Sequence, residues 1–478
     1  MNTQIIGREE EIEILNQLLL SKSPELLAIY GRRRVGKTYL IKTFFKDQII
    51  FSCSGQYQGK TKDQLLNFNI QLGSYFPDSK PQTAPQSWQQ AFQILRECLD
   101  QKKKKSKKVV FFDELPWLDS HKSGFLSAFS YFWNMYLSNR EDLIVVICGS
   151  AASWIIEKVL NNPGGLHNRV TRRIRLLPFS LGETEKYLSH RNIRIDRYQL
   201  IQLYMALGGI PEYLNAIERG KSAAQNIEQI CFSRNGALAG EFDNLYKALF
   251  NHPEKHIQVI KSLAQKNKGL TRTELLKAGK LLSGGTISNT LNELTESGFI
   301  QKIYPLGKLE KNALYRLTDQ FSLFYLKFMQ HTKPHEKNNW LQISTTQTYH
   351  TWCGYAFENV CFTHINQIKR GLQIGGISSS AYSWQITRTK QDAGAQIDLL
   401  IDRADNIINI CEMKFSNDKC TITKKYADEL KNKLTIFRRH LKERKATILT
   451  MITTFGITDN DYKTNIVDNE VTMDSLFS

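Results

Sequence analysis

Apolar runs alternate with segments of helical periodicity over residues 1–180. Residues 26–30, 109–112 and 143–148 are almost continuously apolar, which is typical of strands buried on both faces of a parallel sheet. Ahead of the first run, residues 9–20 place apolar side chains at the three- and four-residue spacing of an amphipathic helix. This alternation predicts an α/β fold with a parallel sheet in this part of the chain.

Helical periodicity continues over residues 181–252, where a Gly-Gly-Ile-Pro turn at 208–211 interrupts it. Residues 253–332 follow a winged-helix rhythm, in which three helical segments precede a hairpin over 299–317. The third segment turns three small polar residues outward, Ser288, Asn289 and Asn292. Four basic residues decorate the hairpin, Lys302, Lys308, Lys311 and Arg316. Such residues can contact a DNA groove and its phosphates, although winged helices also serve as protein–protein or packing modules.

Residues 345–478 form the last predicted domain. Residues 395–402 and 407–414 alternate as two strands around a turn at 403–406. In that hairpin Asp398 and Glu412 come roughly opposite each other, and Lys414 shares the face of Glu412 because it lies two residues further along the strand. Two carboxylates and an ammonium group are therefore expected to converge.

The first apolar run leads directly into a glycine-rich loop of the pattern glycine, four residues, Gly-Lys-Thr. The loop and the start of the following helix are Gly31, Arg32, Arg33, Arg34, Val35, Gly36, Lys37, Thr38 and Tyr39. Backbone N–H groups of such a loop close around a β-phosphate, and the helix N-terminus adds a positive dipole. Lys37 is expected to reach the β- and γ-phosphates, and the Thr38 hydroxyl to hold Mg²⁺. The strand before and the helix after argue against a chance match, so the chain is expected to bind a nucleoside triphosphate, with ATP as the expected cofactor.

A second motif supports this interpretation. The apolar run 109–112 ends in Asp113 and Glu114, at the sheet edge where ligands bind in open α/β folds. Asp113 is expected to bind Mg²⁺ through water, and Glu114 to orient and polarise the attacking water. The pair exceeds what Mg²⁺ alone needs, which points to hydrolysis.

The composition of the chain indicates a class of binding partner and argues against a membrane-spanning or zinc-binding protein. The formal charge of +18 over 478 residues favours a polyanion, of which nucleic acid is the commonest. No apolar run approaches the ~18 residues of a membrane span, which predicts a cytoplasmic protein without a membrane partner. The eight cysteines show no zinc-ligand spacing.

These motifs resemble the archaeal-type ATPases, which are AAA+ or STAND-like P-loop proteins with a winged helix and a C-terminal nuclease-like domain. Gly7 and Arg8 resemble the family's adenine-side segment, and Ser150, which ends the run 143–148, resembles its sensor residue near the γ-phosphate. Arg169 precedes a strand that ends in Leu-Pro-Phe, and the resemblance makes it a candidate γ-phosphate arginine that acts on a neighbouring subunit of a homo-oligomer. The arginine cluster around it is equally consistent with surface charge.

The C-terminal hairpin resembles the PD-(D/E)xK core of restriction endonucleases. That resemblance implies Mg²⁺ at Asp398 and Glu412, with Glu358 joining the site from the first helix of the fold and Lys414 helping to generate the attacking hydroxide. A nuclease-like fold kept as a structural or DNA-binding module is the alternative interpretation.

The sequence thus predicts four domains, namely a P-loop ATPase core (1–180), a helical lid (181–252), a winged helix (253–332) and a restriction-endonuclease-like α/β domain (345–478). Two functions remain open. In the first, ATP gates a metal-dependent DNA nuclease. In the second, the chain is an ATP-controlled DNA-binding or signalling switch that does not cleave.

Overall fold

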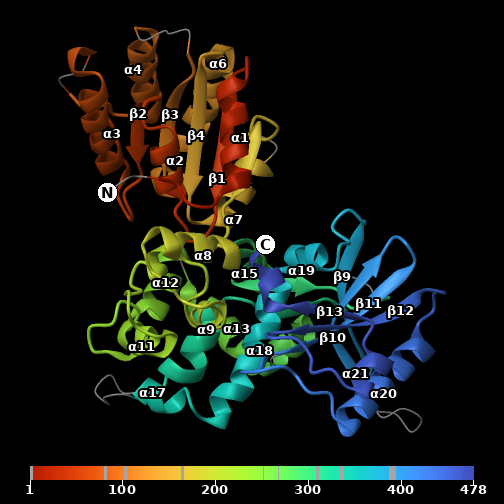
Figure 1. The fold of residues 1–478 in the computed structure, drawn as a ribbon. Helices are drawn as coiled ribbons and strands as arrows, with labels where there is room; N and C mark the ends of the chain where they lie inside the picture. Colours follow the sequence, from red (N-terminus) through yellow and green to blue (C-terminus); the bar gives the residue numbers. More distant parts are fainter. Residues whose placement is uncertain are drawn as a thin grey trace. The chain divides into compact units, whose positions relative to one another are not determined.

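The computed structural model describes residues 4–79, 83–101, 106–162, 166–250, 252–266, 268–307, 312–332, 339–386 and 394–478. These residues fall into two compact units, Met1–Leu177 and Pro178–Ser478 (Figure 1). Among the described residues, no helix combines the length and the apolar character that a membrane crossing requires.

The first unit is built on a five-stranded parallel sheet with the order β2-β3-β4-β1-β5. Its strands are β1 Glu25–Tyr30, β2 Ile49–Ser54, β3 Lys108–Asp113, β4 Leu143–Gly149 and β5 Arg172–Arg175. The three apolar runs noted in the sequence lie within β1, β3 and β4, which confirms the parallel α/β sheet. Because β1, β3 and β4 are adjacent and parallel, the residues that follow them gather at one edge of the sheet.

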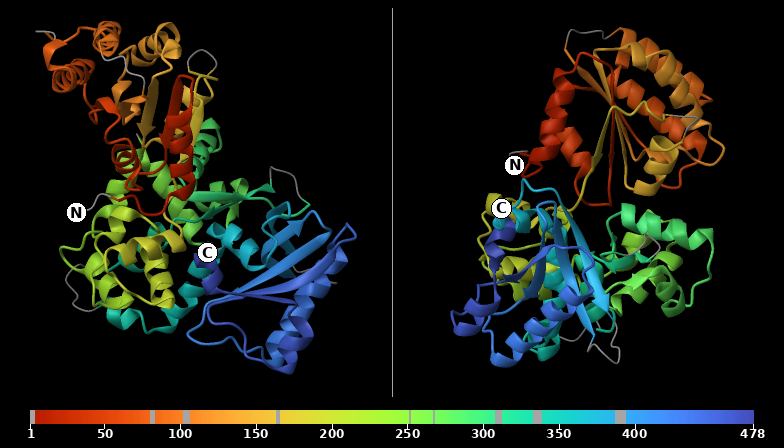
Figure 2. Two further views of the ribbon diagram at one scale, coloured as in Figure 1. Left: turned by 45° about the horizontal axis from the view of Figure 1, so that its top comes forward. Right: turned by 90° about the vertical axis from the view of Figure 1, so that its right-hand side faces the viewer.

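Helices cover both faces of this sheet (Figure 2). The helices are α1 Glu9–Leu20, α2 Lys37–Phe44, α3 Thr61–Tyr75, α4 Trp88–Asp100, α5 Leu115–Leu118, α6 Phe125–Met135 and α7 Ala152–Trp154, with short turns at Pro77–Ser79, Leu137–Asn139 and Ile155–Leu160. One face of the sheet shares a hydrophobic core with α3, α4 and α6. In this core, Phe129 of α6 contacts Phe112 of β3, and Phe92 of α4 contacts both Phe129 and Phe68 of α3. α1 lies on the opposite face and buries Leu15 and Leu18.

The second unit begins with a helical region. Its elements are α8 Leu181–His190, α9 Arg197–Leu207, α10 Pro211–Leu214, α11 Ala223–Ile227, the π-helical turn η4 Glu228–Phe232 and α12 Glu241–Leu249. The predicted break lies between α9 and α10, where Gly208 has a φ of 67°. A Cβ on Gly209 would lie 1.9 Å from the carbonyl oxygen of Phe179, so only glycine allows this approach.

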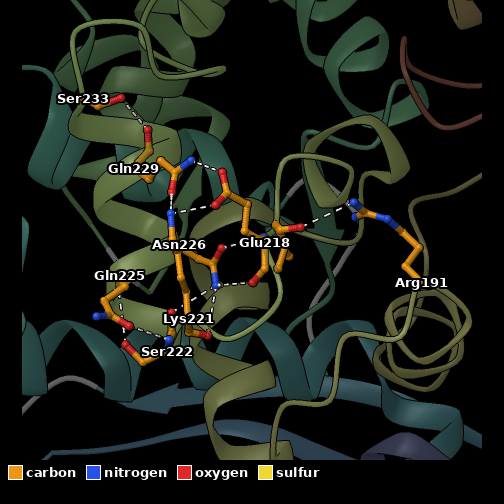
Figure 3. Close-up of polar contacts among 9 residues, drawn as sticks. Arg191, Glu218, Lys221, Ser222, Gln225, Asn226, Gln229 and Ser233 are labelled. Carbon is orange, nitrogen blue, oxygen red and sulfur yellow. Dashed lines mark hydrogen bonds and ion pairs between the residues drawn. The ribbon is translucent and has the colours of Figure 1, made fainter.

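The loop between α10 and α11 is organised by a buried asparagine (Figure 3). Asn226 is fully buried, and its Oδ1 accepts from the backbone N–H of Glu218 at 2.8 Å. Its Nδ2 donates to the carbonyls of Lys221 and Ser222 at 3.2 and 3.1 Å. Beside this loop, the Arg191 guanidinium donates to the carbonyl oxygen of Leu214 at 2.6 Å. These bonds give buried backbone groups of the loop a side-chain partner.

Three helices and a small antiparallel sheet follow. They are α13 Pro253–Ala264, α14 Arg272–Ala278 and α15 Gly285–Glu296, with β6 Leu270–Thr271, β7 Ile300–Ile303 and β8 Leu314–Leu317 in the order β6-β8-β7. On α15, Ser288, Asn289 and Asn292 are exposed as predicted. The winged-helix assignment stays a prediction, and Lys308 and Lys311 lie outside the described residues. The chain continues through α16 Gln320–Phe324, the π-helical turn η6 Tyr325–Met329 and α17 Asn339–Ile343.

A five-stranded mixed sheet of the order β13-β12-β11-β10-β9 completes the second unit. Its elements are α18 Gln347–Thr363, α19 Ile365–Gly371, β9 Ser379–Ile386, β10 Ala395–Arg403, β11 Ile407–Lys414, α20 Lys424–His440, β12 Ala446–Thr453, α21 Asp461–Ile466, β13 Asn469–Thr472 and the turn η7 Met473–Phe477. β10 and β11 form the predicted antiparallel hairpin, with Asn406 in the left-handed region at its turn. Ile408 and Ile410 of β11 share a core with Leu430 and Phe437 of α20.

Candidate functional site

The P-loop joins β1 to α2 through backbone conformations that depend on glycine. Gly31 and Gly36 have φ angles of 149° and 93°, and Arg34 also lies in the left-handed region with a φ of 69°. A Cβ on Gly31 would lie 2.3 Å from the carbonyl oxygen of Leu176, so a larger residue would displace the loop. The loop ends at the N-terminus of α2, as the sequence predicts for a phosphate site.

Lys37 lies inside this loop. Its Nζ donates to the carbonyl oxygens of Gly31 and Arg32, both at 2.9 Å, and the residue is 6% exposed. The neighbouring Val35 is buried beneath the loop. The ammonium group is thus held at the place where the sequence predicts phosphate oxygens, which are stronger acceptors than carbonyls.

The two carboxylates after β3 make separate contacts. The Thr38 hydroxyl donates to Oδ2 of Asp113 at 2.9 Å, and Asp113 is buried. A hydroxyl and a carboxylate so close together supply the oxygen ligands that Mg²⁺ prefers, so these residues fit the predicted ion. Glu114 has a φ of 46° at the start of α5, and its Oε2 accepts from both the backbone N–H and the hydroxyl of Ser150, at 3.0 and 2.8 Å.

Ser150 therefore does more than end β4. It fixes the Glu114 carboxylate by two hydrogen bonds, a contact that the sequence did not indicate because the two residues are 36 positions apart. The predicted role of Ser150 toward the γ-phosphate stays a prediction.

The N-terminal segment is tied to the P-loop. Gly7 and Arg8 have φ angles of 67° and 66°, and Nη2 of Arg8 donates to the carbonyl oxygen of Val35 at 3.1 Å. The Tyr39 hydroxyl donates to the carbonyl oxygen of Gln4 at 3.3 Å. These contacts bring the predicted adenine-side residues beside the loop, while their contact with a base stays a prediction.

Arg169 lies in a turn with its backbone N–H donating to the carbonyl oxygen of Leu166 at 2.9 Å, and the residue is exposed. Its predicted action on a neighbouring subunit is not tested by the structure of one chain.

Burial governs the thiols near both candidate sites. Cys148 of β4 is fully buried, and this burial, reinforced by the Asp113 carboxylate, raises its pKa well above the ordinary value. Burial raises the pKa of Cys411 on β11 to about 12. Both thiols are free and stay protonated at neutral pH.

In the second unit, the hairpin brings the predicted carboxylates together. Leu399 pairs with Cys411, so Asp398 and Glu412 occupy the next position along the two strands. Lys414 is on the face of Glu412, and its Nζ lies 3.4 Å from Oε1 of Glu412. Asp398 accepts a hydrogen bond from the side-chain amide of Gln396.

Glu412 is also contacted by two residues of α20. The Lys433 Nζ donates to Oε2 of Glu412 at 2.7 Å, and the Tyr426 hydroxyl donates to Oε1 at 3.1 Å. Burial acts to raise the pKa of Glu412, but the ammonium groups of Lys433 and Lys414 outweigh it, so the pKa lies below its ordinary value. The sequence shows a basic helix after the hairpin, with Lys433 on it, but it does not show the contact with Glu412. The seven-residue spacing of Tyr426 and Lys433, which puts both on one helix face, is the signal that could have found them.

Glu358 of α18 is held by an arginine from β8. Nη2 of Arg316 lies 2.9 Å from Oε2 of Glu358, and Nε of Arg316 donates to Oδ1 of Asn359 at 2.5 Å. Arg316 is 4% exposed, so its predicted place on the surface of a hairpin wing is wrong. The pKa of Glu358 is raised to about 7, mainly by burial and further by the negative charge of Asp398. The positive charge of Arg316 acts in the opposite direction.

The C-terminal carboxylates do not form a ready metal centre. Within the described residues, no three His, Cys, Asp or Glu side chains are grouped so as to hold a metal ion. Glu412 and Glu358 are instead engaged with Lys433 and Arg316, which a cation would have to displace. The predicted Mg²⁺ ligation by Glu358, Asp398 and Glu412 stays a prediction, and the arrangement supports no cleavage step by itself.

Residues 5–217 match the model of a protein family described as an ATPase domain predominantly from Archaea. This part of the chain is similar to ATPase domains of that family. It contains the whole P-loop site, with Lys37, Thr38, Asp113, Glu114 and Ser150, which agrees with the resemblance drawn from the motifs.

Two relatives come from Methanocaldococcus jannaschii. An uncharacterised protein is 25% identical over 361 residues, covering 74% of this chain and 76% of that protein. An uncharacterised ATP-binding protein is 44% identical over 45 residues, covering 9% of this chain and 76% of that protein. Among solved structures, a Walker-type ATPase of Pyrococcus abyssi is 17% identical to this chain, with a TM-score of 0.51. The match covers 68% of this chain and 97% of that ATPase. At this identity the structural similarity concerns the fold alone.

Proposed function

We propose that the chain is an ATP-hydrolysing protein that acts on DNA. The contact that carries the proposal is the double hydrogen bond from Ser150 to Glu114, beside the Thr38–Asp113 pair. A carboxylate fixed in this way is available to orient water, while Lys37 offers its charge to the phosphates. A Mg²⁺ ion held at Thr38 and Asp113 would neutralise phosphate charge when bound. The contact of Arg8 with the Val35 carbonyl supports a place for the base beside Gly7 and Arg8.

The charge of the chain supports DNA as the partner. An excess of 18 positive charges attracts a polyanion from a distance and raises the rate of association. The exposed polar face of α15, with Ser288, Asn289 and Asn292, is available to a groove of the duplex. In a homo-oligomer, the exposed Arg169 would be available to the nucleotide of a second copy.

A switch that does not cleave is the function that the C-terminal domain supports better. Glu412 and Glu358 are both neutralised by cations of the same unit, and this pairing favours a structural or DNA-binding role. ATP-gated, metal-dependent cleavage is the second candidate, and the convergence of Asp398, Glu412 and Lys414 favours it.

Two substitutions test the ATPase proposal. Lys37→Ala should lose ATP binding because it removes the ammonium group from the loop. Glu114→Gln should keep ATP binding and lose turnover by ~100-fold or more, because an amide cannot polarise water. Nucleotide binding and phosphate release are measured on both variants. Normal hydrolysis by Glu114→Gln would show that the water-orienting role belongs to another residue.

The cleavage candidate is tested separately. Plasmid and linear DNA are incubated with the protein and Mg²⁺ or Mn²⁺, with and without ATP, beside Glu412→Ala. Cutting that disappears in Glu412→Ala would establish a nuclease, and its dependence on ATP would show that the two activities are coupled. Intact DNA in every lane, with ATP hydrolysis retained, would support the switch.

A further inference from the structure

A groove of about 700 Å³ lies on the second unit between α13, the η6 turn and α18. This volume is in the range of protein ligand sites, about 300–1,000 Å³. Residues of both α13 and α18 line it, and Figure 1 labels the two helices. The groove is distinct from the P-loop and from the contacts of Glu412.

The walls of this groove are basic. Lys261 of α13, Lys327 of η6 and His331 line it, and both lysines are exposed. No carboxylate is found among its described lining residues, and neither ammonium group pairs with a carboxylate of the described chain. A concave surface with cations of one sign favours an anionic ligand.

The groove is also lined by an exposed aromatic side chain. Tyr355 of α18 is 41% exposed and lies beside the buried Trp352 in the lining. Gln265 and Gln347 add amide groups that can donate and accept hydrogen bonds. Lysines around an aromatic platform are the features by which proteins hold single-stranded nucleic acid, since the cations follow the phosphates and the ring stacks on a base.

The groove continues into two further hollows. A small one shares Trp352 and Tyr355 with it and is also lined by Lys266 and Arg316. The other hollow has a volume of about 660 Å³. It shares Lys266 with the small hollow and is also lined by Lys268 and Trp384. The three hollows, together called the path, share lining residues and carry basic side chains, with Tyr355 and Trp384 as exposed or half-buried aromatic residues and Glu274 as a carboxylate of the third hollow.

We propose that this path binds single-stranded nucleic acid, with Lys261 and Lys327 on the phosphates and Tyr355 stacked on a base. The proposal rests on the proposed action on DNA and specifies the form of nucleic acid and its binding surface. A duplex is the less suitable ligand, because its bases are already stacked and cannot reach a ring in a groove.

The test measures binding of fluorescein-labelled oligo(dT), oligo(rU) and a DNA duplex of the same length by fluorescence anisotropy at several salt concentrations. The wild-type protein should bind a single strand more tightly than the duplex. Lys261→Ala with Lys327→Ala should weaken this binding by about tenfold or more and reduce the slope of log K against log salt by about 1.4, which corresponds to two phosphate contacts. Tyr355→Ala should weaken it by about fivefold or more, and Tyr355→Phe should not, because phenylalanine keeps the ring.

Lys255→Ala is the matched control, because Lys255 is an exposed lysine of the same helix that does not line the groove. All variants should show the wild-type circular dichroism spectrum and urea midpoints, which shows that both units are folded. If the groove variants bind like Lys255→Ala, the groove assignment is wrong while action on DNA stands. Preference for the duplex would also overturn the groove. If the wild-type protein binds none of the three probes, both proposals fail. The dT and rU arms decide between DNA and RNA.

Discussion

At the scale of single residues, the Ser150 hydroxyl is the side-chain group that orients Glu114. We expect Ser150→Ala to lower the rate of ATP hydrolysis by about tenfold while ATP affinity changes little, because one charge-assisted hydrogen bond is lost and the backbone bond remains. Steady-state phosphate release and equilibrium nucleotide binding, measured on the same preparation, check this prediction.

Ser150→Thr is the control for that variant, since it keeps the hydroxyl. A loss of affinity equal to the loss of rate in Ser150→Ala would instead place the hydroxyl on the nucleotide in the ground state. That result would favour the sensor role suggested by the family resemblance.

A second residue-scale prediction concerns His364, which joins the end of α18 to the start of α8. Its Nδ1 donates to the carbonyl oxygen of Val360 at 2.8 Å, and its Nε2 accepts from the backbone N–H of Leu181 at 2.9 Å. A protonated ring cannot accept this second bond. Burial lowers the pKa of His364 to about 4 from 6.5, while the Val360 carbonyl and Glu183 oppose the shift.

The folded protein therefore binds fewer protons at His364 than the unfolded chain does between these two pKa values. The stabilisation by the neutral ring is fully present above pH 6.5 and is lost as the pH falls toward 4, which amounts to up to about 3 kcal/mol. Urea unfolding at a series of pH values should show this loss, and His364→Gln should show a smaller dependence over the same window. Identical pH profiles for the two proteins would contradict the assignment.

At the scale of elements, the loop between α10 and α11 depends on one amide. Asn226→Ala leaves the backbone N–H of Glu218 and the carbonyls of Lys221 and Ser222 without their buried partner. We expect it to lower the free energy of unfolding by about 1–3 kcal/mol. Urea unfolding measures the effect. Lys221→Ala, which removes an exposed side chain of the same loop, should cost less than 1 kcal/mol.

Elements and motifs were predictable from the sequence where the residues that determine them lie close together along the chain. The strand before Gly31, the helix after it and the hairpin from β10 to β11 follow from apolar runs, glycines and alternation over a few residues. Asp398 and Glu412 could be placed opposite each other because the turn between their strands is short.

Contacts between distant segments could not be predicted in the same way. Arg316 has the pattern of an exposed hairpin residue, and its burial depends on Glu358 and Asn359, which lie 42 and 43 positions further along the chain. The alternation along β8 indicates which residues share a face, but it does not indicate what covers that face. For the same reason, the contact of Lys433 with Glu412 and that of Ser150 with Glu114 could not be predicted from the sequence.

At the scale of the whole molecule, the ion pair of Arg316 and Glu358 fastens a strand of the predicted winged helix to the first helix of the C-terminal domain. The two side chains are 4% and 18% exposed. The guanidinium also lies over the ring of Phe362, 4.5 Å from its centroid. Both predicted domains belong to one compact unit, and this pair is a buried polar connection between them.

Breaking one side of this pair should cost more than removing both. Arg316→Met leaves the Glu358 carboxylate buried without its cation, and we expect it to lower the free energy of unfolding of the second unit by about 3–5 kcal/mol. Adding Glu358→Gln removes the uncompensated charge, so the double variant should recover part of the loss. Hydrogen exchange of the α18 amides reports on this region separately from the ATPase domain. Protection in Arg316→Met equal to that of the wild-type protein would show that the connection between the two domains is carried by apolar packing alone.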